Sequence, residues 1–145
     1  MNFPEFLYNL TARDQQLAPI ELWYGGTTGT ALATGIQTPN YQVPPDRILV
    51  ITSAYLLLAP GAGQSGLSAS LSVQNITNGA STRIDAHTFA APAAAQWAEN
   101  GEFSSVIVPP NGLVFAVGFF NAGAVANSVR WEASGVLIPR GNIII

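Results

Sequence analysis

The residues with the greatest capacity for chemistry are Arg83, Asp85 and His87, which occupy alternate positions in the chain. Side chains two residues apart in a β-strand project from one face, so the three are expected to lie side by side. A His and an Asp at this spacing can begin a metal site or an acid–base pair. Neither a third ligand nor a nucleophile lies nearby, and Ile84 and Ala86 alternate with the trio toward a core. We interpret the trio as the polar outer face of a strand, suited to an intersubunit salt-bridge network. His87 is the group expected to titrate near neutral pH.

The remaining candidate motifs each lack a necessary part. Glu99 and Glu102 flank an expected exposed turn, where the pKa shifts that a glycosidase pair requires are small. The Gly-rich stretch 61–66 has neither the Lys nor the following helix of a phosphate-binding loop. Cysteine is absent, which excludes disulfides and thiolate metal sites. We therefore expect no enzymatic activity, no catalytic residue, no metal and no cofactor.

The composition favours contact with protein over contact with nucleic acid or lipid. Only 9% of the 145 residues are charged, and all five cations are Arg, with no Lys, whereas about 25% of residues are charged in typical soluble domains. Protein interfaces are depleted of Lys and enriched in Arg. The net charge of −3 is opposite in sign to the charge of a typical nucleic-acid-binding surface. No apolar run reaches the roughly 20 residues that span a bilayer. We expect a homo-oligomer or a permanent place in a larger assembly, with no nucleic-acid partner, no membrane partner and no secretory signal.

The elements that position these residues are organised around the stretch Ile48–Leu58, which follows Pro44 and Pro45. Proline fixes φ and donates no hydrogen bond, so the strand is expected to begin after it. Both alternating registers of Ile48–Leu58 are largely apolar, which predicts that both faces of the strand are covered. One cover is a second sheet, and the other is a second subunit or the chain's own N-terminal segment. The sequence Val-Pro-Pro, which precedes this strand at residues 43–45, recurs at Val108-Pro109-Pro110 before a second apolar stretch.

Short strands separated by Gly, Pro and Asn turns fill the rest of the chain. Further strands are expected at Leu67–Val73, Arg83–Phe89, Gln96–Ala98, Phe103–Val108, Leu113–Phe120 and Val129–Ile138, with Glu99–Glu102 as a hairpin turn. About eight strands without a long helix predict an all-β protein, an antiparallel β-sandwich of jelly-roll type. An immunoglobulin-like sandwich is the alternative, but its Cys–Trp–Cys pattern is missing.

The two ends of the chain are expected to lie outside this sandwich, which is assigned to residues 41–141. Residues 1–40 are interpreted as an N-terminal arm, with either a short helix or an extended segment over residues 1–18, and residues 142–145 as an apolar tail. The arm packs either on its own domain or on a neighbour. The side chains expected to contact a partner are Phe3, Phe6, Trp23, Tyr24, Ile143, Ile144 and Ile145.

The chain resembles the small jelly-roll structural proteins of tailed bacteriophages, in particular capsid decoration (cement) proteins. The resemblance lies in the β-rich, Lys-poor, Cys-free composition, in the first strand Val43-Pro-Pro-Asp-Arg-Ile-Leu-Val-Ile-Thr-Ser53, and in the closing Trp131-Glu-Ala-Ser-Gly-Val-Leu-Ile-Pro-Arg-Gly141. It implies a homotrimer on the outer surface of the virion capsid, made in the host cytoplasm, which ties adjacent major capsid protein subunits together. The resemblance implies no catalytic residues in this chain.

Two alternatives remain open beside this resemblance. One is a carbohydrate-binding, receptor-binding module of a phage tail, in which Trp23, Tyr24, Trp97 and Trp131 are the aromatics available for stacking on a sugar. The other is a different small head or tail component of the same virion.

Overall fold

A computed structural model describes residues 19–75, 79–88 and 97–142, with the backbone alone for 83–88, 97–105 and 142. Within this part the chain forms nine strands and one short 3₁₀ turn. The strands are β1 (Glu21–Ala31), β2 (Gly35–Gln37), β3 (Tyr41–Gln42), β4 (Arg47–Ala59), β5 (Gly66–Gln74), β6 (Ser81–Thr88), β7 (Trp97–Val108), β8 (Leu113–Phe120) and β9 (Asn127–Pro139), followed by η1 (Arg140–Asn142). No helix in the described part is long and apolar enough to cross a membrane.

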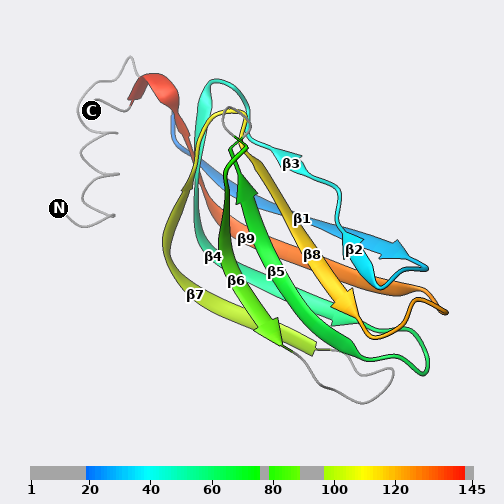
Figure 1. Ribbon diagram of the computed structural model, residues 1–145. Coiled ribbons are helices and arrows are strands. Elements are labelled where there is room, and N and C mark those ends of the chain that lie inside the picture. Colours follow the sequence, from blue (N-terminus) through cyan, green and yellow to red (C-terminus); the bar gives the residue numbers. More distant parts are fainter. Residues whose placement is uncertain (1–18, 76–78, 89–96, 143–145) are drawn as a thin grey trace.

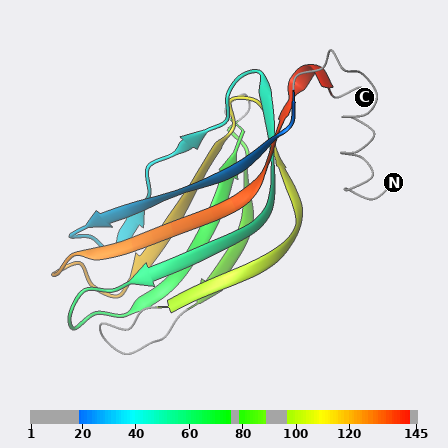
Figure 2. The same ribbon diagram turned by 180° about the vertical axis from the view of Figure 1, so that it is seen from behind.

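The strands form two antiparallel sheets packed face to face (Figure 1). The first, sheet A, has the order β1-β9-β4-β7 and is seen from its outer side in Figure 2. The second, sheet B, has the order β2-β8-β5-β6, and β3 also pairs with β8. Each pair of sheet neighbours joins strands distant in sequence, apart from β5 and β6. The expected all-β, jelly-roll-type sandwich is confirmed.

The two Pro-Pro segments lie side by side. The Val43 amide donates to the Gly112 carbonyl at 2.9 Å, and the Asn111 amide donates to the Val43 carbonyl at 3.0 Å. Asn111 has a positive φ of 62°, a conformation that Asn tolerates better than most residues. Because proline supplies no amide hydrogen, the residues beside each proline pair make these bonds, and both segments end up at the same end of the sandwich.

Residues 21–31 are part of the sandwich rather than of an arm. The whole of β1 pairs with β9, from Glu21 opposite Leu137 to Ala31 opposite Asn127. The expected boundary at residue 41 is therefore too late, since a neighbouring strand supplies the partner that the Gly-rich sequence of β1 does not reveal. Residues 1–18 and 143–145 lie outside the described residues, so the roles expected for Phe3, Phe6 and the three terminal Ile residues stay predictions.

The long strand β7 corrects a second expectation. Residues 97–108 form one strand along β4, and Glu99 and Glu102 lie within it, opposite Leu56 and Ser53. The composition Glu-Asn-Gly-Glu is typical of a turn, but the thirteen-residue β4 supplies backbone partners for residues 97–102 and 106–108, with an irregularity between the two paired segments. Tertiary pairing overrides the local preference here.

A β-bulge at Thr52 changes which residues of β4 face the core. Pairing with β9 runs from Ile51 opposite Gly135 directly to Ser53 opposite Ser134, so Thr52 is the additional residue. The core-facing positions are consequently Leu49 and Ile51 before the bulge, and Ala54, Leu56 and Leu58 after it. Gly135 permits this close approach, because a Cβ there would lie 1.9 Å from the Val50 carbonyl oxygen.

The core lies between the sheets and contains two stacked Trp residues. Trp131 of β9 is fully buried, and its ring lies 6.3 Å from that of Trp23 on β1, with an angle of 26° between the planes. The indole Nε1 donates to Thr38 Oγ1 at 3.2 Å, and the Ala116 amide of β8 donates to the same oxygen at 2.9 Å. Thr38 therefore links the two sheets through polar contacts inside the sandwich.

Candidate functional site

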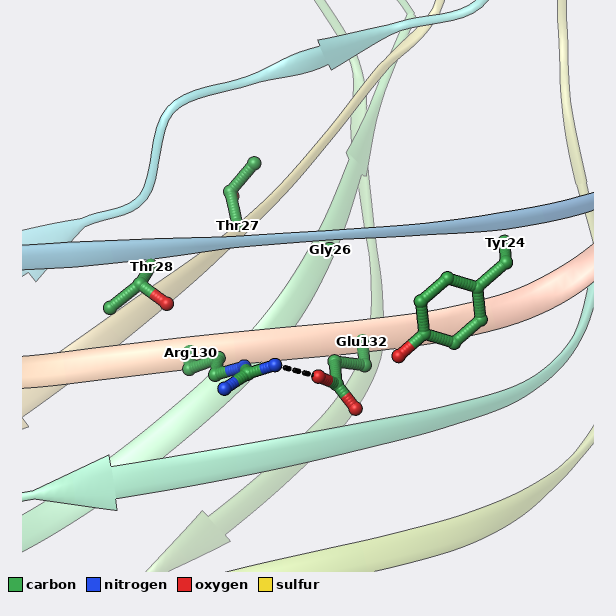
Figure 3. A pocket seen from close by; sticks show the side chains of 6 residues that line it. All are labelled: Tyr24, Gly26, Thr27, Thr28, Arg130 and Glu132. Carbon is green, nitrogen blue, oxygen red and sulfur yellow. Dashed lines mark hydrogen bonds and ion pairs between the residues drawn. The ribbon is translucent and has the colours of Figure 1, made fainter.

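The outer face of sheet A carries a hollow with a volume of about 260 Å³ across β1 and β9 (Figure 3). We call it the Tyr24 hollow. Its lining residues are Tyr24, Gly26, Thr27, Thr28, Arg130 and Glu132. Even-numbered residues of both strands point outward in this region, because the odd-numbered Trp23 and Trp131 point into the core.

Gly26 creates the floor of the hollow. It lies opposite Glu132 in the β1–β9 pair, between the outward side chains of Tyr24 and Thr28. A Cβ at residue 26 would lie 2.5 Å from the Trp131 carbonyl oxygen and 3.1 Å from Glu132 Cγ. Only glycine fits without a shift of these neighbours, and its missing side chain leaves the gap open.

Opposite charges meet on the β9 side of the hollow. Arg130 Nη2 and Glu132 Oε1 form an ion pair, with side-chain exposures of 51% and 27%. The Tyr24 side chain reaches across β9 with its hydroxyl toward Glu132 (Figure 3). A hydrogen bond to Glu132 raises the pKa of Tyr24, and burial and the carboxylate charge act in the same direction, while Arg130 opposes them. The hollow thus holds a neutral phenol, a carboxylate and a guanidinium.

Replacing Glu132 by Gln is expected to lower the pKa of Tyr24 toward the ordinary value for tyrosine, because both the acceptor charge and its repulsion of the phenolate are removed. In the native protein the Tyr24–Glu132 contact stabilises the fold below the pKa of unfolded tyrosine, and this contribution is lost as pH rises through the higher folded pKa. NMR titration of the Tyr24 ring carbon measures the pKa in both proteins. An unchanged or higher pKa in Glu132→Gln would contradict the assignment.

A second, smaller hollow of about 110 Å³ adjoins the first and shares Tyr24 and Glu132 with it. Its other lining residues include Ser53 and Tyr55 of β4 and Ser134 of β9. The hydroxyls of Ser53 and Ser134 are 2.6 Å apart and hydrogen-bonded. The two hollows together form a polar depression across β1, β9 and β4.

A separate apolar surface lies on the outer face of sheet B. The outward residues of β8 are Leu113, Phe115, Val117 and Phe119, which we call the β8 stripe; Phe119 is 49% exposed and the others are half-buried. The β5 residues opposite Phe115, Val117 and Phe119 are Ser72, Ser70 and Ser68. An apolar row bordered by hydroxyls on a central strand is a typical protein-contact surface.

The end of sheet A nearest η1 also carries outward apolar residues. Leu22, Val136, Val50 and Ile107 are cross-strand neighbours in one row over all four strands. Leu22 is 92% exposed and Ile107 67% exposed, whereas Val50 and Val136 are buried. The expectation that β4 is apolar and covered on both faces therefore applies to the segment before Thr52.

The structure separates the aromatic residues expected from the sequence to contact a partner. Tyr24 is 69% exposed, as partner contact requires, but Trp23 is buried against Trp131 and Tyr41. The interpretation of Trp23 as a partner contact is thus wrong for this chain, because adjacent strand residues face opposite ways and Trp23 takes the core side. A sugar-stacking platform of Trp23 and Trp131 is excluded for the same reason; the Trp97 side chain lies outside the described residues.

In β6 a register shift of the backbone pairing separates Arg83 from Asp85 and His87. Arg83 pairs with Ser72, whereas Asp85 pairs with Leu71 and His87 with Ala69, with a register shift between them. The trio therefore does not occupy one uninterrupted row, and its intersubunit role stays a prediction. No group of three His, Asp or Glu residues that could hold a metal occurs among the described residues.

Comparison with known proteins finds only low-identity matches to solved structures. No family model matches the chain, and no curated protein matches it in sequence. A D431N mutant VP2 protein of infectious bursal disease virus aligns with 87% of this chain at 13% identity and a TM-score of 0.38, and the chain spans only 33% of that protein. The nora virus structure aligns with 81% at 12% identity and a TM-score of 0.37, over 57% of its chain. The C-terminal family 22 carbohydrate binding module of Clostridium thermocellum Xyn10B aligns with 86% at 10% identity and a TM-score of 0.33, over 88% of its chain.

Proposed function

We propose that the protein is a non-enzymatic structural component of a virion, a capsid decoration or cement protein that binds the outside of the major capsid shell as a homotrimer. The observation that carries the proposal is the β8 stripe, a partly exposed apolar row on a central strand of a chain with very few charges. Burying such a row against protein is favourable by about 25 cal/mol per Å² of apolar area. Copies of the chain associate through it, and Phe3, Phe6 and Ile143–Ile145 supply the contacts to the capsid.

The trimer contact is confined to one face of the sandwich. A single apolar surface made of both β4 and β8 is excluded, because β4 belongs to sheet A and β8 to sheet B, and their outer sides point in opposite directions (Figures 1 and 2). The β8 stripe is continuous, because all four of its side chains are at least partly exposed, whereas Val50 and Val136 in the middle of the row on sheet A are buried. It is therefore the surface that we assign to self-association.

Substitution of Phe119 by Asp is expected to weaken self-association by about 30-fold or more, the effect of losing one interface hot spot. Phe119 is the most exposed member of the stripe, and a buried carboxylate without a partner adds a desolvation cost. Light scattering behind a sizing column measures the mass. The native chain is expected near three times 15.2 kDa, and Phe119→Asp near the protomer mass at the same concentration.

The matched control is Leu22→Asp, which places the same charge at an exposed apolar position on the opposite sheet. It is expected to remain trimeric. A monomeric native protein, or a trimer that persists in Phe119→Asp, contradicts the assigned surface. Co-sedimentation with shells of the major capsid protein then tests attachment, and a trimer that does not sediment with shells contradicts the capsid role.

A further inference from the structure

We propose that the Tyr24 hollow and the adjoining smaller hollow form a binding site for two consecutive units of a neutral oligosaccharide. The site is independent of the β8 stripe, which lies on the opposite face of the sandwich. Of the four aromatics that the sequence offers for stacking on a sugar, it uses Tyr24 alone, together with one ion pair and a glycine floor.

The Tyr24 ring provides the apolar wall that a sugar ring requires. It is exposed, stands between the two hollows, and lines both of them. A pyranose has one face rich in C–H groups, which packs on an aromatic ring, while its hydroxyls remain available at the edge. A Tyr side chain suits this contact because it combines an apolar body with a polar tip.

The charges beside the ring select hydroxyl groups in preference to ions. The Glu132 carboxylate accepts hydrogen bonds from sugar hydroxyls, and the Arg130 guanidinium donates to their oxygens. Hydrogen bonds with one charged partner are stronger than neutral ones. Because Arg130 and Glu132 already neutralise each other in their ion pair, a carboxylated sugar would have to displace Glu132 from Arg130. A neutral sugar with neighbouring hydroxyls uses both groups without that loss.

The available space fits this ligand. Ligand pockets for drug-sized molecules measure about 300–1,000 Å³, so a hollow of about 260 Å³ suits one ring-sized unit. The adjoining hollow of about 110 Å³ offers the Ser53 and Ser134 hydroxyls to the next unit. Glu132 lies between the two and can contact both units.

The proposal is tested by backbone-amide NMR of the full chain with cellotriose, maltotriose and mannotriose as probes at millimolar concentration. At least one of these neutral sugars is expected to shift the amides of residues 24–28 and 130–134. Tyr24→Ala and Glu132→Gln are each expected to weaken binding by about 10-fold, the effect of one aromatic contact or one charged hydrogen bond. Leu22→Ala, on the same strand and face but outside both hollows, is the matched control and is expected to bind like the native chain.

Three results would overturn the proposal: no shift with any neutral trisaccharide, shifts confined to other surfaces, or binding that Tyr24→Ala and Glu132→Gln leave unchanged. The acidic probe 3′-sialyllactose tests the ligand class, and tighter binding of this probe than of the neutral sugars would overturn the assignment to neutral saccharides. Since the mass of the native protein is measured separately, failure here leaves the assembly proposal standing, and the reverse also holds.

Discussion

Replacement of Trp131 by Ala is expected to lower the free energy of unfolding by about 3–5 kcal/mol, the range measured for removal of a buried aromatic side chain. Trp131 is fully buried and stacks on Trp23. Its loss leaves a cavity between the sheets and also removes the donor to Thr38 Oγ1. Close packing inside proteins limits how far the surrounding side chains can move to fill such a space.

Urea unfolding, followed by circular dichroism at one fixed protomer concentration, measures the loss, because oligomer stability depends on concentration. Trp131→Phe keeps an aromatic ring but not the N–H donor, so this variant is expected to lose less stability than Trp131→Ala. Tyr24→Ala removes an exposed aromatic from the neighbouring strand and is expected to change stability by about 0.5 kcal/mol or less. If Trp131→Ala costs no more than Tyr24→Ala, the described core is wrong.

Replacement of Asn127 by Ala is expected to lower the free energy of unfolding by about 3 kcal/mol or more. The Asn127 side chain is fully buried and makes three hydrogen bonds to three separate loops. Its Oδ1 accepts from the Gly61 amide at 2.9 Å, and its Nδ2 donates to the carbonyls of Ala33 and Ala122 at 2.9 and 2.8 Å. Each buried group left without a partner costs about 1–3 kcal/mol. Asn127 therefore fixes one end of the sandwich.

The near-isosteric Asn127→Asp separates shape from hydrogen bonding. It keeps the acceptor for Gly61 but loses both donors and places a carboxylate beside two carbonyls, so we expect a loss at least as large as that of the Ala variant. The control is Asn121→Ala, which removes one exposed contact to the Ser65 amide, with an expected loss of about 1 kcal/mol or less. Thermal unfolding at neutral pH ranks the three variants. Equal losses for Asn121→Ala and Asn127→Ala would refute this role.

The strands with strong hydrophobic patterns could be predicted from the sequence, whereas β1 could not. Ile48–Leu58, Leu67–Val73, Leu113–Phe120 and Val129–Ile138 all lie within observed strands. In β1 the core-facing positions after Trp23 include Gly25 and Gly29, which produce no apolar alternation. Both are small for reasons of packing, since a Cβ at Gly25 would lie 2.4 Å from the Trp23 ring and one at Gly29 would lie 2.7 Å from the Gln37 carbonyl oxygen. The pattern that identifies most strands is absent where a neighbour occupies the side-chain space.

The candidate site was predictable only in part. The sequence marks Tyr24 as a partner-contacting aromatic, and the alternation of Val129–Ile138 puts Arg130 and Glu132 side by side on its polar face, but it does not show that Tyr24 meets them. Their contact depends on the pairing of β1 with β9, between positions about a hundred residues apart in sequence. Non-local pairing of this kind leaves no local signal in composition or periodicity. The bulge at Thr52 likewise leaves no signal in the sequence.

That bulge has a consequence for how the protein can diverge. Before Thr52 the outward positions of sheet A are apolar, as in Val50 and Val136, and beyond it they are mainly polar, as in Ser53 and Tyr55, with Leu57 as an exception. Because the two zones lie at different places along the sheet, substitutions of outward residues in one zone leave the outward side chains of the other unchanged. Outward residues of the polar zone can therefore change without altering the apolar zone or the core beneath. The extra residue at Thr52 marks the border between the apolar and the polar part of one sheet face.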